Sequence, residues 1–168
     1  MNTITMAENN ISKAEELNRH LKKNVEEIGL YEFKPDDKEI TKFCELIGDD
    51  NLIYLDNIAA NKAGFEGKVI PPSYMTSLTN PLVQLILTKG GPHLFSKLVK
   101  AFIHVGSEIE FLKPMTMNKK YKIKTELSEP IKKSGKKGVY YNIIFKLSVL
   151  DENNIIYAVD NHDCFFKL

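Results

Sequence analysis

The segment "KVIPPSYMTSLTNPLVQLILTKGG", residues 68–91, decides the fold class of this chain. Two prolines stand where a helix can begin, because a missing N–H costs nothing in the first helical turn. A helix without a wide polar face is typical of one that is buried on most sides. The residues after the prolines are apolar on nearly every helical face: Tyr74, Met75, Leu78, Leu82, Val83, Leu85, Ile86 and Leu87. The segment therefore predicts a buried central helix.

A second pattern begins at residue 101, where apolar and polar side chains alternate with a period of two. This alternation is typical of β-strands with one buried face. The predicted strands are "AFIHVGSEIEF", "YKIKTEL", "VYYNIIFKLSVL" and "IIYAVDNHDCFFKL", of which the last two are joined by the turn sequence "DENN". Helices followed by an antiparallel meander predict an α+β fold, in which one sheet wraps around the buried helix.

The N-terminal part of the chain is predicted to be helical. Residues 9–28 place apolar side chains at steps of three and four and stop at Gly29. The sequence "YEFKPDD" predicts a short extended piece and a turn, with Asp36 or Asp37 as the N-cap of a helix that runs to Gly48. The sequence "NIAANKAGF" predicts another short helix. Short helices around polar turns are therefore expected before the central helix.

The bulk composition is that of one globular domain. The chain has 168 residues, of which 43% are hydrophobic and 27% charged, and this length is about that of one domain. A net charge of +1 gives no electrostatic reason to expect nucleic acid or a membrane as a partner. The N-terminus shows no signal-peptide pattern. The two cysteines, Cys44 and Cys164, lack metal-ligand or CxxC spacing, so a cytoplasmic location is expected.

The stretch "IGDDNLIYLDNIAANKAGF", residues 47–65, holds a dense polar cluster that has two interpretations. On a turn between helices, short polar side chains cap helix ends and bind the local backbone. Alternatively, packed flanking helices present Asp49 to a pocket, where its carboxylate orients or deprotonates water. Tyr54 suits a hydrogen-bond or proton donor better than a base, because an unperturbed phenol titrates near ~10.

Two histidines and one basic turn are further candidates. His104 and His162 lie in predicted strands, where each is either a hydrogen-bonded structural residue or a catalytic one. No two of the four histidines have metal-ligand spacing, so no metal site is predicted. The sequence "IKKSGKKG", residues 131–138, is either a solvated hairpin tip or a place that receives a phosphorylated cofactor such as coenzyme A. The sequence carries no phosphate loop, nucleophile elbow or dinucleotide fingerprint.

Two segments together resemble the MaoC-like dehydratases, and most of all their FAS1-type dehydratase N-terminal domain branch. They are "ITKFCELIGDDNLIYLDNIAANKAGFEGKVIPPSY" and "HVGSEIEFLKPM". The shared features are the "GD-x-N-x-x-x-x-D" spacing, the Pro-Pro start of the central helix and the "EF-x-x-P" strand, in the family's order. The resemblance implies a hot-dog fold, a curved antiparallel sheet around a long central helix. This domain would span residues 29–168, with residues 1–28 as an added N-terminal helix.

The resemblance also implies roles for the loop residues. In active members, an aspartate and a histidine of the signature "GD-x-N-P-x-H" hold the water that hydrates a trans-2-enoyl thioester. Asp49 matches that aspartate and Asn51 matches the asparagine, whereas Tyr54 stands at the position of the histidine. Asp49, Asn51 and Tyr54 are therefore the predicted catalytic residues.

Active members use a further element, a backbone N–H at the start of the central helix that stabilises the thioester oxyanion. Two prolines occupy this place here, and proline has no N–H. The donor would then come from Ser73 or Tyr74. The predicted substrate-binding residues are Pro72, Ser73, Tyr74 and His104.

Three functions stay open at this point. The first is a hydro-lyase that reversibly hydrates a trans-2-enoyl thioester to a 3-hydroxyacyl thioester, with Asp49 on water and Tyr54 or His104 as proton partner. The second is a non-catalytic hot-dog subunit that binds the acyl thioester beside a catalytic subunit, and the third is a hot-dog thioesterase. Coenzyme A or acyl carrier protein would carry the substrate, so no separate cofactor is expected. Family members pair, which implies a homodimer or a heterodimer with another hot-dog subunit.

Overall fold

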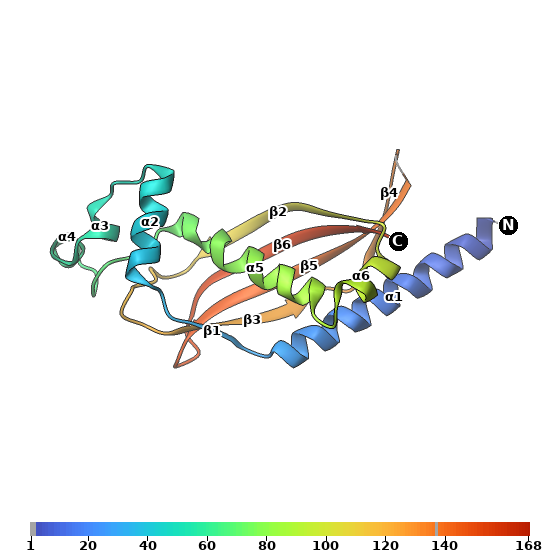
Figure 1. Cartoon of the computed structure of the whole chain (residues 1–168), viewed down its shortest axis with the longest axis horizontal. Coiled ribbons are helices and arrows are strands. Elements are labelled where there is room, and N and C mark those ends of the chain that lie inside the picture. The colour runs from blue at the N-terminus through green and yellow to red at the C-terminus, as the bar shows by residue number, and fades with distance from the viewer. Residues whose placement is uncertain (1–2, 137) are drawn as a thin grey trace.

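Six strands form one curved antiparallel sheet, and a long helix crosses one of its faces (Figure 1). The computed structural model describes residues 3–136 and 138–168, with side chains for all of these except residues 3–12 and 92–94. The helical elements are α1 (Thr3–Ile28), α2 (Asp37–Ile47), α3 (Leu52–Leu55), α4 (Asn57–Lys62), the 3-10 turn η1 (Pro72–Tyr74), α5 (Met75–Thr88) and α6 (Pro92–Leu98). The strands are β1 (Tyr31–Phe33), β2 (Ala101–Phe111), β3 (Tyr121–Leu127), β4 (Ile131–Gly135), β5 (Gly138–Asp151) and β6 (Ile156–Lys167). The predicted α+β class is confirmed.

The order of the strands differs from the predicted meander. The order is β1-β3-β5-β6-β2, with β4 paired to β5 outside this path. β2 does not form a hairpin with β3 and instead pairs with β6 at one edge of the sheet. The segment between β2 and β3 is fixed against the chain before α5, because Ile70 N donates to Met115 O and Met117 N donates to Lys68 O. Residues 112–120 therefore form an anchored crossover and not a tight turn.

The central helix α5 is buried on one face, and the prediction that it is buried on most sides was wrong. Its buried residues face the sheet, and its other face is open in this chain. Polar residues and Pro81 occupy that open face together with Leu85, which is 42% exposed. The buried set is Met75, Thr79, Leu82, Val83, Ile86 and Leu87, and the open set is Thr76, Ser77, Asn80, Pro81, Gln84, Leu85 and Thr88.

The hydrophobic core lies between α5 and the sheet. β5 supplies its centre, because Ile143, Phe145, Leu147 and Val149 alternate toward the helix and are fully buried. Burying a side chain of this size contributes about 1.5–3 kcal/mol to the free energy of folding. These residues are in register with β3 on one side and β6 on the other. The core therefore fixes the position of α5 relative to the strands.

The N-terminal helix α1 packs onto this same core. Leu17 and Leu21 are fully buried in it, and Asn24 donates to the carbonyl of Ile86 at 2.8 Å. The division of the chain into residues 1–28 and 29–168 stays a prediction, and residues 1 and 2 lie outside the described residues. None of the helices in residues 3–136 and 138–168 combines the length and apolar character needed to cross a membrane.

Candidate functional site

The end of α2 positions Asp49. Gly48 adopts a left-handed conformation with φ of 69°, which ends the helix, and Asp49 N donates to Cys44 O at 2.9 Å. A residue with a side chain enters this region only with strain, so glycine is the natural helix-ending residue here. Asp49 Oδ1 accepts from Asn51 N at 3.2 Å. The carboxylate is therefore held at the turn, and the Oδ2 atom has no hydrogen-bond partner among the described residues.

Two polar side chains of the loop are the N-caps of short helices. Asn51 Oδ1 accepts from Ile53 N at 3.2 Å and begins α3, a single helical turn that the sequence did not predict. Asp56 Oδ1 accepts from Ala59 N at 2.7 Å and begins α4. These contacts agree with the capping interpretation of the loop. Asn51 stays a predicted catalytic residue, and the structure shows it stabilising the turn between Asp49 and Tyr54.

Tyr54 lies on α3 and faces a cleft. Burial, followed by the charges of Asp49 and Cys44, raises the pKa of the Tyr54 phenol above its usual value. The hydroxyl therefore stays protonated at neutral pH and has no hydrogen-bond partner among the described residues. It can donate a proton or a hydrogen bond, and the raised pKa makes it unsuited to act as a base. Asp49 and Tyr54 thus provide an acceptor and a donor on one turn.

The cleft beside Tyr54 has a volume of about 310 Å³ and mostly apolar walls. Hydrogen bonds fix its walls, because Val69 N donates to Ile53 O at 2.9 Å and Ile70 N donates to Met115 O at 2.8 Å. The cleft thus lies where α3, the start of the central helix and the end of β2 meet. Its lining residues are Ile53, Tyr54, Phe65, Val69, Ile70, Pro72, Phe111, Leu112, Lys113, Pro114 and Met115.

The start of the central helix supplies one free backbone donor. Tyr74 N donates to Pro71 O at 2.9 Å, whereas Ser73 N has no hydrogen-bond acceptor among the described residues. Pro72 lines the cleft, so the neighbouring Ser73 N–H is the better candidate for an oxyanion donor. The Tyr74 ring lies in the core against Phe43, with ring centroids 5.0 Å apart. Its burial, the hydrogen bond with Glu39 and nearby acidic charges raise the pKa of Tyr74.

His104 lies away from this cleft. It is on β2, and Phe111 at the far end of the same strand lines the cleft. Seven residues of extended strand span roughly 20 Å. His104 is exposed, and its ring stacks on His162 with centroids 3.8 Å apart. Within one chain, Tyr54 and Pro72 therefore line the same cleft, Asp49 lies close enough to Tyr54 to raise its pKa, and His104 lies outside that group.

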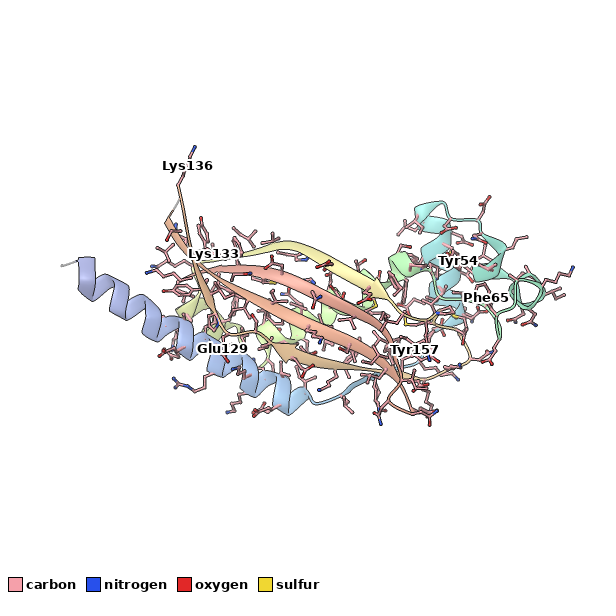
Figure 2. All side chains as sticks on the ribbon, turned by 180° about the vertical axis from the view of Figure 1, so that it is seen from behind. Tyr54, Phe65, Glu129, Lys133, Lys136 and Tyr157 are labelled. Carbon is pink, nitrogen blue, oxygen red and sulfur yellow. The ribbon has the colours of Figure 1, made fainter. Side chains whose placement is uncertain are left out.

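The basic turn of residues 131–138 is also far from the cleft. It forms the hairpin of β4 and β5, and every residue of β4 is exposed, which agrees with the interpretation as a solvated hairpin tip. Figure 2 shows Lys133 and Lys136 at the opposite end of the molecule from Tyr54 and Phe65. Lys137 lies outside the described residues. Within one chain, these lysines and Tyr54 cannot contact the same small ligand.

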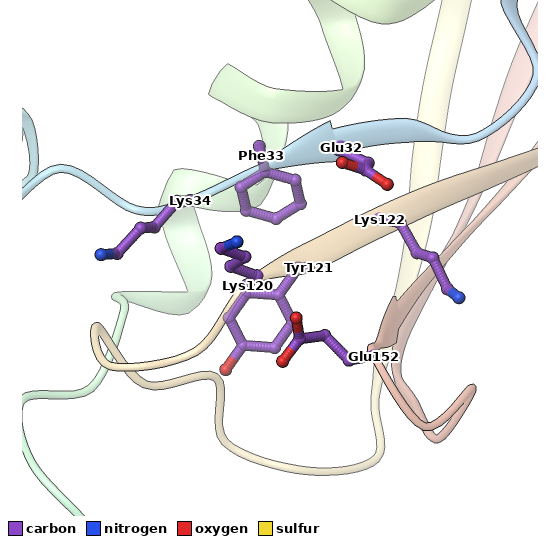
Figure 3. A pocket seen from close by; sticks show the side chains of 7 residues that line it. All are labelled: Glu32, Phe33, Lys34, Lys120, Tyr121, Lys122 and Glu152. Atoms are coloured by element: carbon purple, nitrogen blue, oxygen red, sulfur yellow. The ribbon is translucent and has the colours of Figure 1, made fainter.

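A different hollow, of about 530 Å³, lies near the first strand (Figure 3). It contains no predicted site residue. Its walls carry three lysines and two glutamates around two stacked aromatic rings, whose centroids are 5.6 Å apart. The lining residues are Glu32, Phe33, Lys34, Lys120, Tyr121, Lys122 and Glu152. Among the described residues, no group of three metal-ligating side chains is present.

Sequence reasoning missed the apolar half of the cleft. Phe65, Phe111, Leu112 and Met115 line it with Tyr54, but periodicity alone does not show that the end of β2 returns to the loop. One signal was available, because Phe111 and Leu112 lie in the segment "EFLKP", residues 110–114, that the family resemblance singled out. Phe111 and Leu112 are 43% and 50% exposed, so both present apolar surface at the cleft.

Comparisons with known proteins identify the fold. No protein-family model matches the sequence, and no curated protein matches it significantly. A chain of the ChsH1-ChsH2 complex from Mycobacterium tuberculosis has a TM-score of 0.64 at 20% identity, with 86% of this chain and 94% of that chain covered. The (R)-hydratase from A. caviae involved in PHA biosynthesis has a TM-score of 0.60 at 15% identity, with coverage of 81% and 91%.

A third similar structure is described as a MaoC-like dehydratase. The MaoC-like dehydratase from Rhodospirillum rubrum has a TM-score of 0.58 at 15% identity, with 82% of this chain and 87% of that chain covered. Structural similarity at such low sequence identity establishes the fold of the backbone. It does not establish the reaction, which has to be argued from the residues of the site. The chain therefore has the hot-dog fold of the MaoC-like dehydratases and (R)-hydratases.

Proposed function

We propose that this protein binds acyl thioesters of coenzyme A or acyl carrier protein and reversibly hydrates a trans-2-enoyl group to a 3-hydroxyacyl group. The observation that carries the proposal is the apolar cleft that Tyr54 and Pro72 line, with Asp49 close enough to Tyr54 to raise its pKa and with the free Ser73 N–H next to Pro72. An apolar cleft with a few polar groups suits a ligand with an acyl chain and one reactive end. The fold shared with an (R)-hydratase supports this assignment.

Each polar group has a distinct task in this reaction. The Asp49 carboxylate, with its free oxygen, orients water and accepts a proton as the water oxygen bonds to C3 of the enoyl group. The Ser73 N–H stabilises the negative charge that develops on the thioester oxygen. The Tyr54 hydroxyl donates a hydrogen bond to water or substrate, and C2 takes up the proton that Asp49 accepted, which completes the addition of water and regenerates the carboxylate. Preorganised donors in an apolar site act strongly because bulk water is excluded from them.

A second function, that of a subunit that binds acyl thioesters without catalysing a reaction, is favoured by the lack of a suitable base among the residues that line the cleft. The raised pKa of Tyr54 makes it unsuited as a base at neutral pH, and no histidine lines the cleft among the residues whose side chains the structure describes. The similar structure from Mycobacterium tuberculosis is a complex of ChsH1 and ChsH2. A partner hot-dog subunit would then supply the missing acid/base group.

The two functions are separated by an assay with crotonyl-CoA. Hydration removes the absorbance of the conjugated enoyl thioester without releasing free thiol. The protein alone should show this signal if it is the hydratase, and it should do so only with a catalytic hot-dog partner if it is the binding subunit. Release of thiol would instead identify a thioesterase.

Isotope exchange gives a check that does not depend on the direction of the reaction. With 3-hydroxybutyryl-CoA in deuterated water, reversible dehydration should exchange the proton at C2. Tyr54→His is a useful companion variant, because it places an imidazole where the loop has a phenol. Absence of turnover and exchange for the protein alone and with a hot-dog partner would rule out the proposed hydration.

A further inference from the structure

A second hollow lies directly beside the cleft and shares part of its wall. Its volume is about 290 Å³. Phe65, Lys113 and Pro114 line both this hollow and the cleft, so the two are neighbours on one surface. We call the second space the side hollow. Its lining residues are Gly64, Phe65, Glu66, Lys113, Pro114, Thr116, Lys119 and Tyr157.

The walls of the side hollow are more polar than those of the cleft. Two lysines, a glutamate, a threonine and a tyrosine line the side hollow. Lys113 is the one charged residue that lines the cleft, and it stands where the two spaces meet. An apolar space suits an acyl chain, whereas polar walls suit groups that need hydrogen bonds. A ligand that fills both spaces therefore combines an apolar end with a polar one.

Hydrogen bonds hold the side hollow in shape. Asn118 Nδ2 donates to the carbonyl of Glu66 at 3.2 Å, and Lys119 Nζ lies 3.3 Å from the carboxylate of Glu66. Lys119 Nζ also donates to Tyr157 Oη at 3.3 Å, and the hydrogen bonds with Tyr157 and Glu66 raise the pKa of Lys119. The turn that carries Glu66 is thereby fixed to the crossover between β2 and β3. The side hollow is therefore formed before any ligand binds.

Lys113 brings a positive charge that no acidic group offsets. Lys119 and Glu66 form an ion pair with each other. The ammonium group of Lys113 has no ion-pair or hydrogen-bond partner among the described residues, and the residue is exposed. Its backbone is fixed, because Lys113 N donates to Tyr157 O at 3.1 Å. The rim between the two spaces therefore presents a positive charge that is available to an anion.

A buried hydroxyl in the wall of the side hollow also lacks a partner. Thr116 is 5% exposed, and its Oγ1 atom has no hydrogen-bond partner among the described residues. A buried hydroxyl that stays unpaired is costly, and a ligand that bonds to it recovers that cost. Amide groups suit this task, because each has a donor and an acceptor.

The other basic places on the molecule fit an anion beside the cleft less well. The hairpin of residues 131–138 lies at the opposite end of the molecule from Tyr54 (Figure 2). The hollow near β1 shares no lining residue with the cleft. Its Lys34 and Lys122 extend in opposite directions in Figure 3, so they do not converge on one anion. Of these basic places, the side hollow is the one that adjoins the cleft.

From these contacts we infer that the side hollow receives the polar arm of the thioester's carrier, with the amide groups of the arm along the wall of Thr116 and its phosphate on Lys113. The inference rests on the proposed function, because it concerns the carrier of the acyl group that lies in the cleft. Coenzyme A and acyl carrier protein hold their acyl groups on the same phosphopantetheine arm. A charge-assisted hydrogen bond from Lys113 to this phosphate is stronger than a neutral one.

Binding of saturated thioesters tests the inference without any turnover. Butyryl-pantetheine and butyryl-phosphopantetheine carry the same acyl group and differ in the phosphate. Isothermal titration calorimetry should show about 10-fold tighter binding of the phosphorylated ligand, because a hydrogen bond to a charged group contributes that much. The difference should shrink at high salt, since Lys113 is exposed. Equal affinities of the two ligands at low salt overturn the phosphate site.

A pair of matched variants assigns the effect to one lysine. Lys113→Gln should remove the 10-fold difference and leave the affinity for butyryl-pantetheine unchanged. Lys133→Gln makes the same change of charge on the exposed hairpin at the far end of the molecule and should keep the difference. Melting curves check that both variants fold. A difference that persists in Lys113→Gln, or that disappears in Lys133→Gln, overturns the role of Lys113.

Two further ligands distinguish the sources of the arm. Tighter binding of butyryl-CoA than of butyryl-phosphopantetheine identifies contacts with the nucleotide, and tighter binding of butyryl-acyl carrier protein identifies contacts with the carrier protein. In both cases Lys113→Gln should weaken binding by about the same 10-fold, because the phosphate of the arm is common to the two carriers. If neither affinity depends on Lys113, the arm does not lie in the side hollow.

Kinetics separate this inference from the proposed hydration. Lys113→Gln should raise KM for crotonyl-CoA about 10-fold with kcat unchanged, because the phosphate is bound equally in the ground state and the transition state. If the ligands bind with the phosphate effect but crotonyl-CoA is not hydrated, the hydration fails and the side hollow stands. If they bind without that effect, the inference fails alone. If no butyryl thioester binds, both fail.

Discussion

The polar loop before α4 contrasts with four polar residues of β2 and β6, which we call the edge cluster: Asp160, His162, Ser107 and His104. In the loop, Asn51 and Asp56 cap helices, and Asp49 bonds the local backbone. In the edge cluster, His162 and Asp160 are buried, and the contact of His162 with Ser107 joins residues that are 55 positions apart in the sequence. The loop is therefore specified locally, whereas the cluster exists only because β2 and β6 are neighbours. Changes in the loop should affect chemistry, and changes in the cluster should also affect stability.

The largest expected effect is on activity in the loop. Asp49→Asn should lower kcat/KM for crotonyl-CoA by about 10²-fold or more, because the amide cannot accept the proton of water. The midpoint of thermal unfolding should stay nearly unchanged, since the amide oxygen can still accept from Asn51 N. Steady-state kinetics and a melting curve on the same preparation check both parts. If Asp49→Asn keeps wild-type activity, the proposed role of Asp49 as the acceptor of the water proton is wrong.

The next effect is on stability in the edge cluster. His162→Ala should lower the free energy of unfolding by about 2 kcal/mol, because it removes the neighbour of the buried Asp160 carboxylate and of the half-buried Ser107 hydroxyl. Urea denaturation measures the loss. His104→Ala, at the exposed end of the same stack, is the matched control and should cost clearly less. If His162→Ala and His104→Ala lose the same free energy of unfolding, the burial of His162 does not contribute to stability as argued.

A smaller effect concerns the phenol of the loop. Tyr54→Phe should lower kcat/KM by about 10-fold, because it removes one hydrogen bond that the hydroxyl donates to water or substrate in the transition state. The pKa of Tyr54 is raised, so the phenol stays protonated as the pH rises through the usual range of tyrosine near ~10. Wild-type activity should therefore show no loss from this group up to pH ~10. A fall in activity below that pH that vanishes in Tyr54→Phe would contradict the raised pKa.

The smallest effect tests how the end of α2 holds Asp49. Gly48→Ala should destabilise the protein by about 1 kcal/mol, because alanine is strained at a φ of 69°. Gly135→Ala is the matched control, since that glycine has an ordinary φ and open space around its Cβ position. Differential scanning calorimetry compares the two variants. An equal effect at both sites would show that the left-handed turn is not required.

Much of the secondary structure was predictable because it follows from local patterns. The limits of β2 and β3 agree with the alternating runs from residue 101 and from Tyr121, and Asp36 is the N-cap of α2. The single turn of α3 was not predicted, because four residues are too short for a periodic pattern. The exposed face of α5 was missed for a related reason. Threonine, serine and proline separate its apolar residues without forming a charged stripe.

The sequence by itself determined the candidate loop and its capping residues, because these depend on residues only a few positions apart. Its resemblance to the MaoC-like dehydratases marked Tyr54 as standing at the position of a histidine. Only the tertiary structure decided that β2 pairs with β6, that Phe111 returns to Tyr54 and that His104 stacks on His162. These contacts join segments separated by about 50 residues or more, with a bulge that shifts the register. Strand order and register depend on how the whole core packs, and a local pattern carries no information about either.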